Sequence, residues 1–326
     1  KAVIIAKPAL RFNEQDKLVL DQYLMKGGRI LWFLDRVDVS TDSLTMDATM
    51  AMINDLNLDD MLFRYGIRIN PVLIKDLQCN IIPVNVALTG NTPDFRPSPW
   101  YYFPLLSSPP GHPVTRNLNM IKSEFVNTID TIGARKGIIK TVLLKSSVYS
   151  TFSVAPALIS LDEIRIKPNP EEFRSSGMPV AVLLEGTFES VFRNRMVDNI
   201  IPGAAKDFIA SGSASKMLVV ADGDIIRNDI RITPKGIYSL PLGFDRYTQQ
   251  TYGNKDFIMN ALHYITGNEE LIKLRSREIT LRLLNKVKVK EEKVFWTLIN
   301  TALPGVVIII AGLIYNYLRR RKYTTI

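Results

Sequence analysis

The segment from residue 2 to residue 35, AVIIAKPALRFNEQDKLVLDQYLMKGGRILWFLD, decides which fold the sequence predicts. Residues 2–6 are typical of a buried strand, and residues 12–28 predict a helix with Asn13 as its N-cap. Residues 29–35 then predict a second strand. A strand, a helix and a strand at this spacing form a right-handed crossover between parallel strands. We therefore expect an α/β domain with a largely parallel, doubly wound sheet.

The chain beyond this unit continues with alternating helical and strand-like patterns. Helices are expected at 46–66, at 254–267 and at 268–286, where the last runs on towards the C-terminal end. The β-branched content predicts strands at 72–76, 125–133, 138–153, 179–192 and 216–224. The short run SGSAS at 211–215 is typical of a flexible loop. Residues 1–285 are thus expected to form one α/β domain.

A proline-rich stretch at 90–113 interrupts this pattern, and we expect it to be an ordered excursion without regular structure. It contains the aromatic run WYYF, in which Trp100, Tyr101 and Tyr102 are the binding candidates. Two interpretations stay open. The aromatic rings form an exposed platform for a glycan or a peptide, or they hold the loop on the core.

The C-terminal part contains 25 residues, 294–318, without a charged side chain. As a helix this run reaches about 37 Å, which exceeds the hydrocarbon thickness of about 30 Å. Four cations follow at 319–322, and aromatic residues lie near both ends. We expect a transmembrane helix at 294–318, between a basic juxtamembrane linker at 286–293 and a basic cytoplasmic tail at 319–326.

Polar and small residues inside this span favour contact with a second membrane helix. Asn300 offers an amide for an interhelical hydrogen bond, and Pro304 frees a backbone carbonyl one turn earlier. Gly305 and Gly312 allow a close approach of two helices. A kinked helix without a partner is the alternative, because glycine and proline are common in membrane helices.

The formal charge of +9 does not indicate a nucleic-acid partner. Most of the excess lies at 286–293 and 319–322, where cations meet the head groups of a lipid bilayer. The rest of the chain has no basic stripe interleaved with aromatic residues. Cations flank both ends of the span, so charge alone does not decide its orientation.

The sequence contains no recognisable catalytic motif and none for a cofactor. It lacks a phosphate-binding G-x-x-x-x-G-K-[ST] loop, a G-x-S-x-G elbow and a zinc-binding cluster of cysteine and histidine. The single Cys79 lies between two strand-like segments, and of the two histidines His263 is expected to be buried on its helix. We therefore expect no enzyme activity and no cofactor.

Acidic residues follow three of the predicted strands, namely Asp35, Glu185 and Asp222, with Asp224 two residues further on. The carboxyl ends of parallel strands line one crevice, where doubly wound folds bind ligands. These four carboxylates would hold a polar ligand or a cation there, and the metal is not identified. Alternatively, they cap the helices and turns that follow.

Several segments together resemble the gliding-motility-associated ABC transporter auxiliary family, GldG. They are LDQYLMKGGRILWFLD at 20–35, WYYFPLLSSPPGHPVTRNLNMIKSEFVNTID at 100–130, GMPVAVLLEGTFESVFRNR at 177–195, KMLVVADGDIIRND at 216–229 and GNKDFIMNALHYITG at 253–267. The resemblance implies a soluble part similar to class I glutamine-amidotransferase-like domains and to the intraflagellar-transport-type domain. Members usually carry a further span and domain upstream.

The resemblance also implies a location and partners. It implies a bacterial inner-membrane protein of Bacteroidetes type with its α/β domain in the periplasm, working with a membrane permease subunit and a separate ATPase subunit. The chain would then be a non-enzymatic auxiliary subunit whose domain binds a partner or a solute. The alternative is a membrane-tethered hydrolase or amidotransferase-like enzyme that uses the strand-end crevice.

Overall fold

The computed structural model describes residues 1–39, 44, 48–85, 94–133, 137–175, 177–234, 236–267 and 293–323. The chain divides into two compact units, Lys1–Ser276 and Arg277–Ile326. The helix predicted at 268–286 and nearly all of the predicted linker at 286–293 lie outside the described residues.

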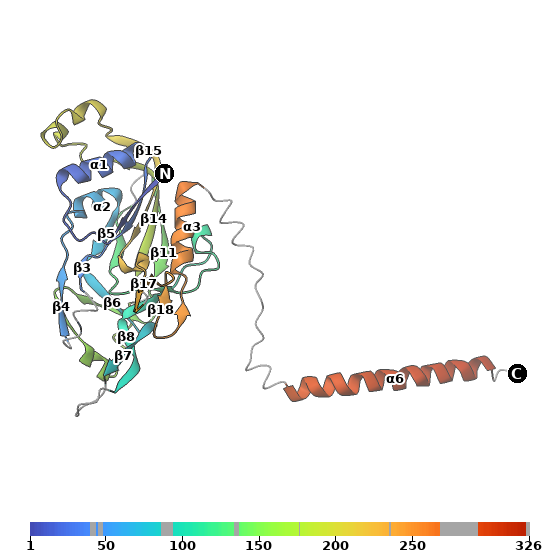
Figure 1. The fold of residues 1–326 in the computed structure, drawn as a ribbon. Coiled ribbons are helices and arrows are strands. Elements are labelled where there is room, and N and C mark those ends of the chain that lie inside the picture. Colours follow the sequence, from blue (N-terminus) through green and yellow to red (C-terminus); the bar gives the residue numbers. More distant parts are fainter. Residues whose placement is uncertain are drawn as a thin grey trace. The chain divides into compact units, whose positions relative to one another are not determined.

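A five-stranded mixed sheet forms the centre of the first unit (Figure 1). Its strands, in spatial order, are β1 (Ala2–Ala6), β2 (Arg29–Phe33), β15 (Ser211–Val220), β14 (Pro179–Glu189) and β11 (Ile138–Lys145). The first three are parallel to one another, whereas β14 is antiparallel to both of its neighbours. The expectation of a largely parallel, doubly wound sheet is therefore wrong.

The first crossover was predicted correctly. Helix α1 (Glu14–Met25) connects the parallel strands β1 and β2, and the side chain of Asn13 accepts a hydrogen bond from the Asp16 amide at 2.7 Å. Gly27 follows the helix with φ +81°, a backbone conformation that side chains disfavour. Local signals of capping and termination thus fix this unit.

The central sheet buries both of its faces. Side chains alternate between the faces of a strand, so Trp32 and Met217 contact one core while Leu31 and Leu218 contact another. Helices α1 and α2 (Asp59–Tyr65) pack against the first face, and α3 (Asn254–Thr266) packs against the second (Figure 1). This double burial explains why the strands read as continuous apolar runs.

Small antiparallel sheets make up the rest of the described unit. Two have three strands: β3 (Val37–Asp38), β4 (Ala48–Ile53) and β13 (Ala157–Ser160); and β7 (Cys79–Asn85), β8 (Phe95–Leu106) and β9 (Ile121–Lys122). Four are pairs: β5 (Ile67–Asn70) with β10 (Thr128–Thr131), β6 (Val72–Asp76) with β12 (Ser150–Val154), β16 (Ile230–Thr233) with β17 (Gly236–Ser239), and β18 (Phe244–Asp245) with β19 (Gln250–Thr251).

Three local predictions were wrong. The helix expected at 46–66 is strand β4 followed by the short helix α2, because β4 pairs with β13 from a distant part of the chain. The loop expected at 211–215 is the beginning of β15. The predicted strand at 138–153 is divided between β11 and β12, which belong to different sheets.

Strand β8 lies within the stretch for which no regular structure was expected. Pro97 and Pro99 lie opposite Pro83 and Ile81 of β7. Alternate residues of an antiparallel strand direct their amide nitrogens away from the neighbouring strand. Two prolines spaced two residues apart therefore share one orientation, and the strand tolerates them when that orientation is away from β7.

The described part of the second unit is helix α6 (Lys293–Tyr323). It is long and apolar enough, over Phe295–Lys322, to cross a membrane. It continues through the basic residues 319–322, so the predicted span ends before the helix does. Asn300, Pro304, Gly305 and Gly312 are exposed on it, and their contact with a partner helix stays a prediction.

Candidate functional site

Three of the four predicted acidic residues converge at one edge of the central sheet. Asp35 follows β2, Asp222 follows β15, and Asp224 lies two residues beyond. A carboxylate oxygen of each lies within 4.8 Å of the others. They meet because β2 and β15 are adjacent and parallel, so that their carboxyl ends reach the same edge.

The ammonium group of Lys7 pairs with two carboxylates of this cluster. Lys7 follows β1, and its Nζ lies 2.6 Å from Oδ2 of Asp224 and 3.2 Å from Oδ2 of Asp35. Its backbone has φ +43°, in a region that a side chain disfavours. The chain thus supplies a cation of its own between two of the aspartates.

Backbone amides bind the remaining carboxylate oxygens. Asp35 Oδ1 accepts from the Gly223 amide at 2.6 Å, and the two oxygens of Asp222 accept from the amides of Asp224 at 2.7 Å and Glu124 at 3.1 Å. The bond from the Asp224 amide to Asp222 is a local turn bond of the kind that the alternative interpretation predicted, whereas the Gly223 and Glu124 amides come from segments distant from their acceptors. A ligand role for the three aspartates is still a prediction.

Burial and mutual repulsion perturb the pKa values of the cluster. Burial, reinforced by the charges of Asp224 and Asp35, raises the pKa of Asp222 well above its ordinary value. Burial also raises the pKa of Asp35, although the charge of Lys7 opposes this effect. The pKa of Lys7 is raised, because the attraction of Asp35 and Asp224 outweighs the lowering effect of burial.

Glu185 does not join this cluster. Because β14 is antiparallel to β15, Glu185 lies opposite Lys216, well before the carboxyl end of β15. Its carboxylate pairs with Lys216 at 3.2 Å and accepts from the Tyr264 hydroxyl at 3.1 Å. The prediction of a four-carboxylate crevice is wrong for this residue, because it assumed a parallel β14.

The aromatic run does not form an exposed platform. Trp100 and Tyr102 are 0% and 1% exposed, and both belong to the core beneath β8. Tyr101 is half-buried, with its ring centroid 5.9 Å from that of Phe173. These side chains therefore hold β8 on the domain, as the second interpretation proposed.

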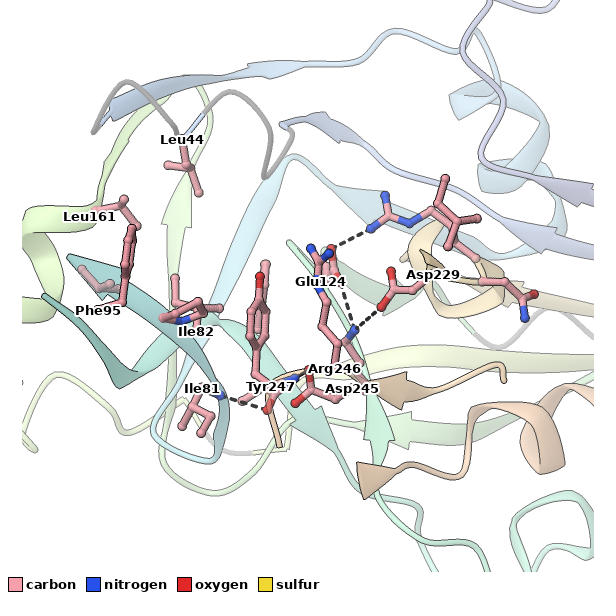
Figure 2. Close-up of a pocket in the computed structure, with 18 of the residues that line it drawn as sticks. Leu44, Ile81, Ile82, Phe95, Glu124, Leu161, Asp229, Asp245, Arg246 and Tyr247 are labelled. Carbon is pink, nitrogen blue, oxygen red and sulfur yellow. Dashed lines mark hydrogen bonds and ion pairs between the residues drawn. The ribbon is translucent and has the colours of Figure 1, made fainter. Parts of the chain in front are cut away.

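The first unit contains a cavity of about 960 Å³ (Figure 2), and one of its lining residues, Arg227, pairs with Asp224 of the acidic cluster. One wall is apolar and comes from β7, the first residue of β8 and the start of the turn after β13. Its main side chains are Ile81, Ile82, Val84, Phe95 and Leu161. The volume falls within the range of about 300–1,000 Å³ that is typical of sites for small organic ligands.

Charged side chains form the opposite wall. Arg227 pairs with Asp224 at 2.7 Å and with Glu124 at 2.9 Å, and Lys122 pairs with Glu124 at 3.5 Å and with Asp229 at 3.4 Å. Burial raises the pKa of Glu124, although both cations act against this effect. Arg227 thus connects the strand-end cluster to the cavity.

Sequence reasoning missed the basic residues of the site. Lys7 immediately follows a predicted strand at the same edge as Asp35, and Arg227 lies three residues after Asp224. The spacing of Asp224 and Arg227 is a usable signal for an ion pair. Lys122 and Arg246 reach the cavity from distant segments, and no local pattern reveals them.

The described residues place no activated nucleophile at the cavity. Burial and the nearby charge of Asp76 raise the pKa of the Cys79 thiol to about 12, so it is protonated at neutral pH. His112 accepts a hydrogen bond from the Val114 amide, and its ring packs on Tyr264 with 4.8 Å between centroids. His263 is half-buried rather than fully buried.

Comparisons with known proteins assign the chain to a family. No curated protein matches the sequence. Among solved structures, the mmIFT52 N-terminal domain is similar with a TM-score of 0.39 and 13% identity, over 81% of this chain and 76% of that one. The model of the family described as "ABC-type uncharacterized transport system" matches residues 1–261. The chain therefore belongs to this family of auxiliary components of ABC-type transport systems.

Proposed function

We propose that this chain is a membrane-anchored, non-enzymatic auxiliary subunit of an ABC-type transporter, and that its soluble unit binds a solute or partner in the cavity. The observation that carries the proposal is the two-walled cavity of about 960 Å³ in a member of a transport-system family. An apolar wall facing a few oriented charges is typical of sites that bind small organic ligands.

The composition of the chain supports a division of labour between subunits. Its 326 residues include no phosphate-binding loop, so ATP hydrolysis belongs to a separate ATPase. In the described residues one helix is long and apolar enough to cross a membrane, and in this proposal a separate permease provides the translocation path. Helix α6 anchors the soluble unit beside these partners.

The finer assignment to gliding motility, to Bacteroidetes and to the periplasm is also part of this proposal. The family resemblance of the sequence and the arginine-rich end of α6 support it. A reporter that fluoresces only in the cytoplasm, fused after Ile326, is expected to be bright. A dark fusion with intact protein would contradict the orientation.

Affinity purification of the tagged chain from native membranes tests the main proposal. We expect a permease and an ATPase to copurify at fixed stoichiometry, because an auxiliary subunit acts only within its complex. The matched control is a chain in which α6 is replaced by an unrelated membrane helix. Purification of the wild-type chain without either partner would contradict the proposal.

The enzymatic alternative is tested on the same preparation with activated ester and amide substrates. We expect no turnover above that of a preparation carrying Asp222→Asn. Turnover that this substitution abolishes would establish the strand-end edge as a catalytic site instead.

A further inference from the structure

We propose that the cavity binds a water-soluble amphipathic anion, with an apolar body on the β7 wall and its acidic group on Arg246. This inference rests on the proposed function, because it names the chemical class of the solute that the same cavity would take.

Arg246 differs from the other cations of the cavity in its partners. Its guanidinium lies 5.2 Å from the ring centroid of Tyr247, and in the described part of the chain no ion pair joins it to a carboxylate. Lys122 and Arg227, by contrast, are each shared between two carboxylates. An incoming anion therefore finds its best cation at Arg246.

The carboxylates around the cavity are already compensated. Asp162 pairs with Arg165 at 3.2 Å, and Asp229 pairs with Lys122 at 3.4 Å. Asp245 is buried and accepts from the amides of Tyr247 and Thr248 and from the Thr248 hydroxyl at 2.6 Å. A cationic ligand would have to displace these donors, whereas an anionic ligand would not. The wall thus favours negative charge without being strongly positive.

The ligand must also have an apolar body. Phe95, Tyr247 and Ile230 line the cavity and are 61%, 47% and 55% exposed. Figure 2 shows the Tyr247 ring between the apolar side chains around Ile82 and the charged group around Glu124. A flat or aliphatic body between these surfaces would remove them from water, which is favourable at about 25 cal/mol per Å².

The test uses two probes that differ only in their acidic group, 1-naphthyl phosphate and the neutral 1-naphthol. Calorimetric titrations use the full chain in nanodiscs of phosphatidylcholine, with empty nanodiscs as the background. We expect the wild-type chain to bind the phosphate more tightly than the alcohol. Equal affinities, or no binding of the phosphate, would overturn the proposal.

Two substitutions separate the acidic group from the body. Arg246→Gln is expected to weaken phosphate binding about tenfold, because one charged hydrogen-bonding partner is lost, and to leave naphthol binding unchanged. Phe95→Ala is expected to weaken both probes equally. Arg246 and Phe95 are exposed, so neither change endangers the fold. An Arg246→Gln chain with wild-type affinity for the phosphate would refute the assigned role.

Two controls complete the design. Arg193→Gln removes an arginine that pairs with Glu189, outside the cavity, and is expected to change neither affinity. Titrations of the phosphate probe in nanodiscs that contain anionic phospholipid are expected to give the same Kd as those in phosphatidylcholine nanodiscs. A raised Kd would show that a lipid head group occupies the site. If the probes do not bind but the transporter subunits copurify, the ligand class fails while the auxiliary role stands.

Discussion

Substitution of Lys7 by methionine removes the cation that pairs with both Asp35 and Asp224 at the strand-end cluster. Lys7 Nζ is 2.6 Å from Asp224 and 3.2 Å from Asp35, and these carboxylates are 6% and 12% exposed. Removing one partner of a buried pair costs about 3–5 kcal/mol, whereas an exposed pair contributes about 0–1 kcal/mol. Because the Lys7 side chain is 40% exposed, we expect a loss in the free energy of unfolding of about 2 kcal/mol at pH 7.

The loss must depend on pH in a definite direction. The folded-state pKa of Asp35 already lies above its ordinary value of 3.8, and without Lys7 it rises further. An acid with a raised folded-state pKa stabilises the fold below the unfolded-state pKa and loses that contribution as pH rises through the folded value. The cost of Lys7→Met is therefore largest at neutral pH and shrinks as pH falls towards 3.8.

Urea unfolding of the full chain in detergent, followed by tryptophan fluorescence from pH 4.5 to pH 8, measures this cost. Trp32 and Trp100 are fully buried and report unfolding, and Trp296→Phe removes the signal of α6. The double substitution with Asp35→Asn is the matched control and is expected to recover part of the stability. A loss that is the same at every pH, or an increase in stability at pH 8, would refute the reasoning.

Three further predictions concern other parts of the chain. In Gly212→Ala the added Cβ would lie 2.7 Å from Met25 Cα. We therefore expect the free energy of unfolding in urea to fall by about 1–3 kcal/mol, as overpacking does, and an unchanged midpoint would contradict this. Burial raises the pKa of Cys79 to about 12, so the rate of its reaction with iodoacetamide should still rise as the pH increases beyond 9. A rate that reaches a plateau near pH 9 would show an ordinary thiol. A leucine-rich replacement of 294–318 that keeps 319–322 should lower permease copurification, whereas a wild-type yield would make the span a plain anchor.

The parts of the fold that the sequence predicts are those that local signals determine. The β1–α1–β2 crossover follows from Asn13, Gly27 and two apolar runs. The direction of β14 does not follow from its residues, because a strand buried on both faces reads alike in either direction. That direction depends on the long connections at 146–178 and 190–210, which carry no topological signal of their own.

The same limit applies to the candidate site. Asp35, Asp222 and Asp224 were predictable, because each follows an apolar strand and parallel neighbours bring their ends together. Glu185 has the same sequence pattern but lies on the reversed strand, so the pattern misplaces it. The cavity needs β7, the segment around Arg227 and the turn at Arg246 together, and only tertiary packing brings them to one place.

Lys7 has a consequence for how this edge of the sheet responds to its surroundings. A dissolved cation occupies an acidic site in proportion to its concentration, whereas Lys7 is covalently attached and its effective concentration at the cluster is constant. The pairing of Lys7 with Asp35 and Asp224 therefore needs no dissolved cation. This edge of the sheet thus carries a positive charge whose supply does not depend on divalent ions, and Asp224 links it to Arg227 on the adjoining cavity wall.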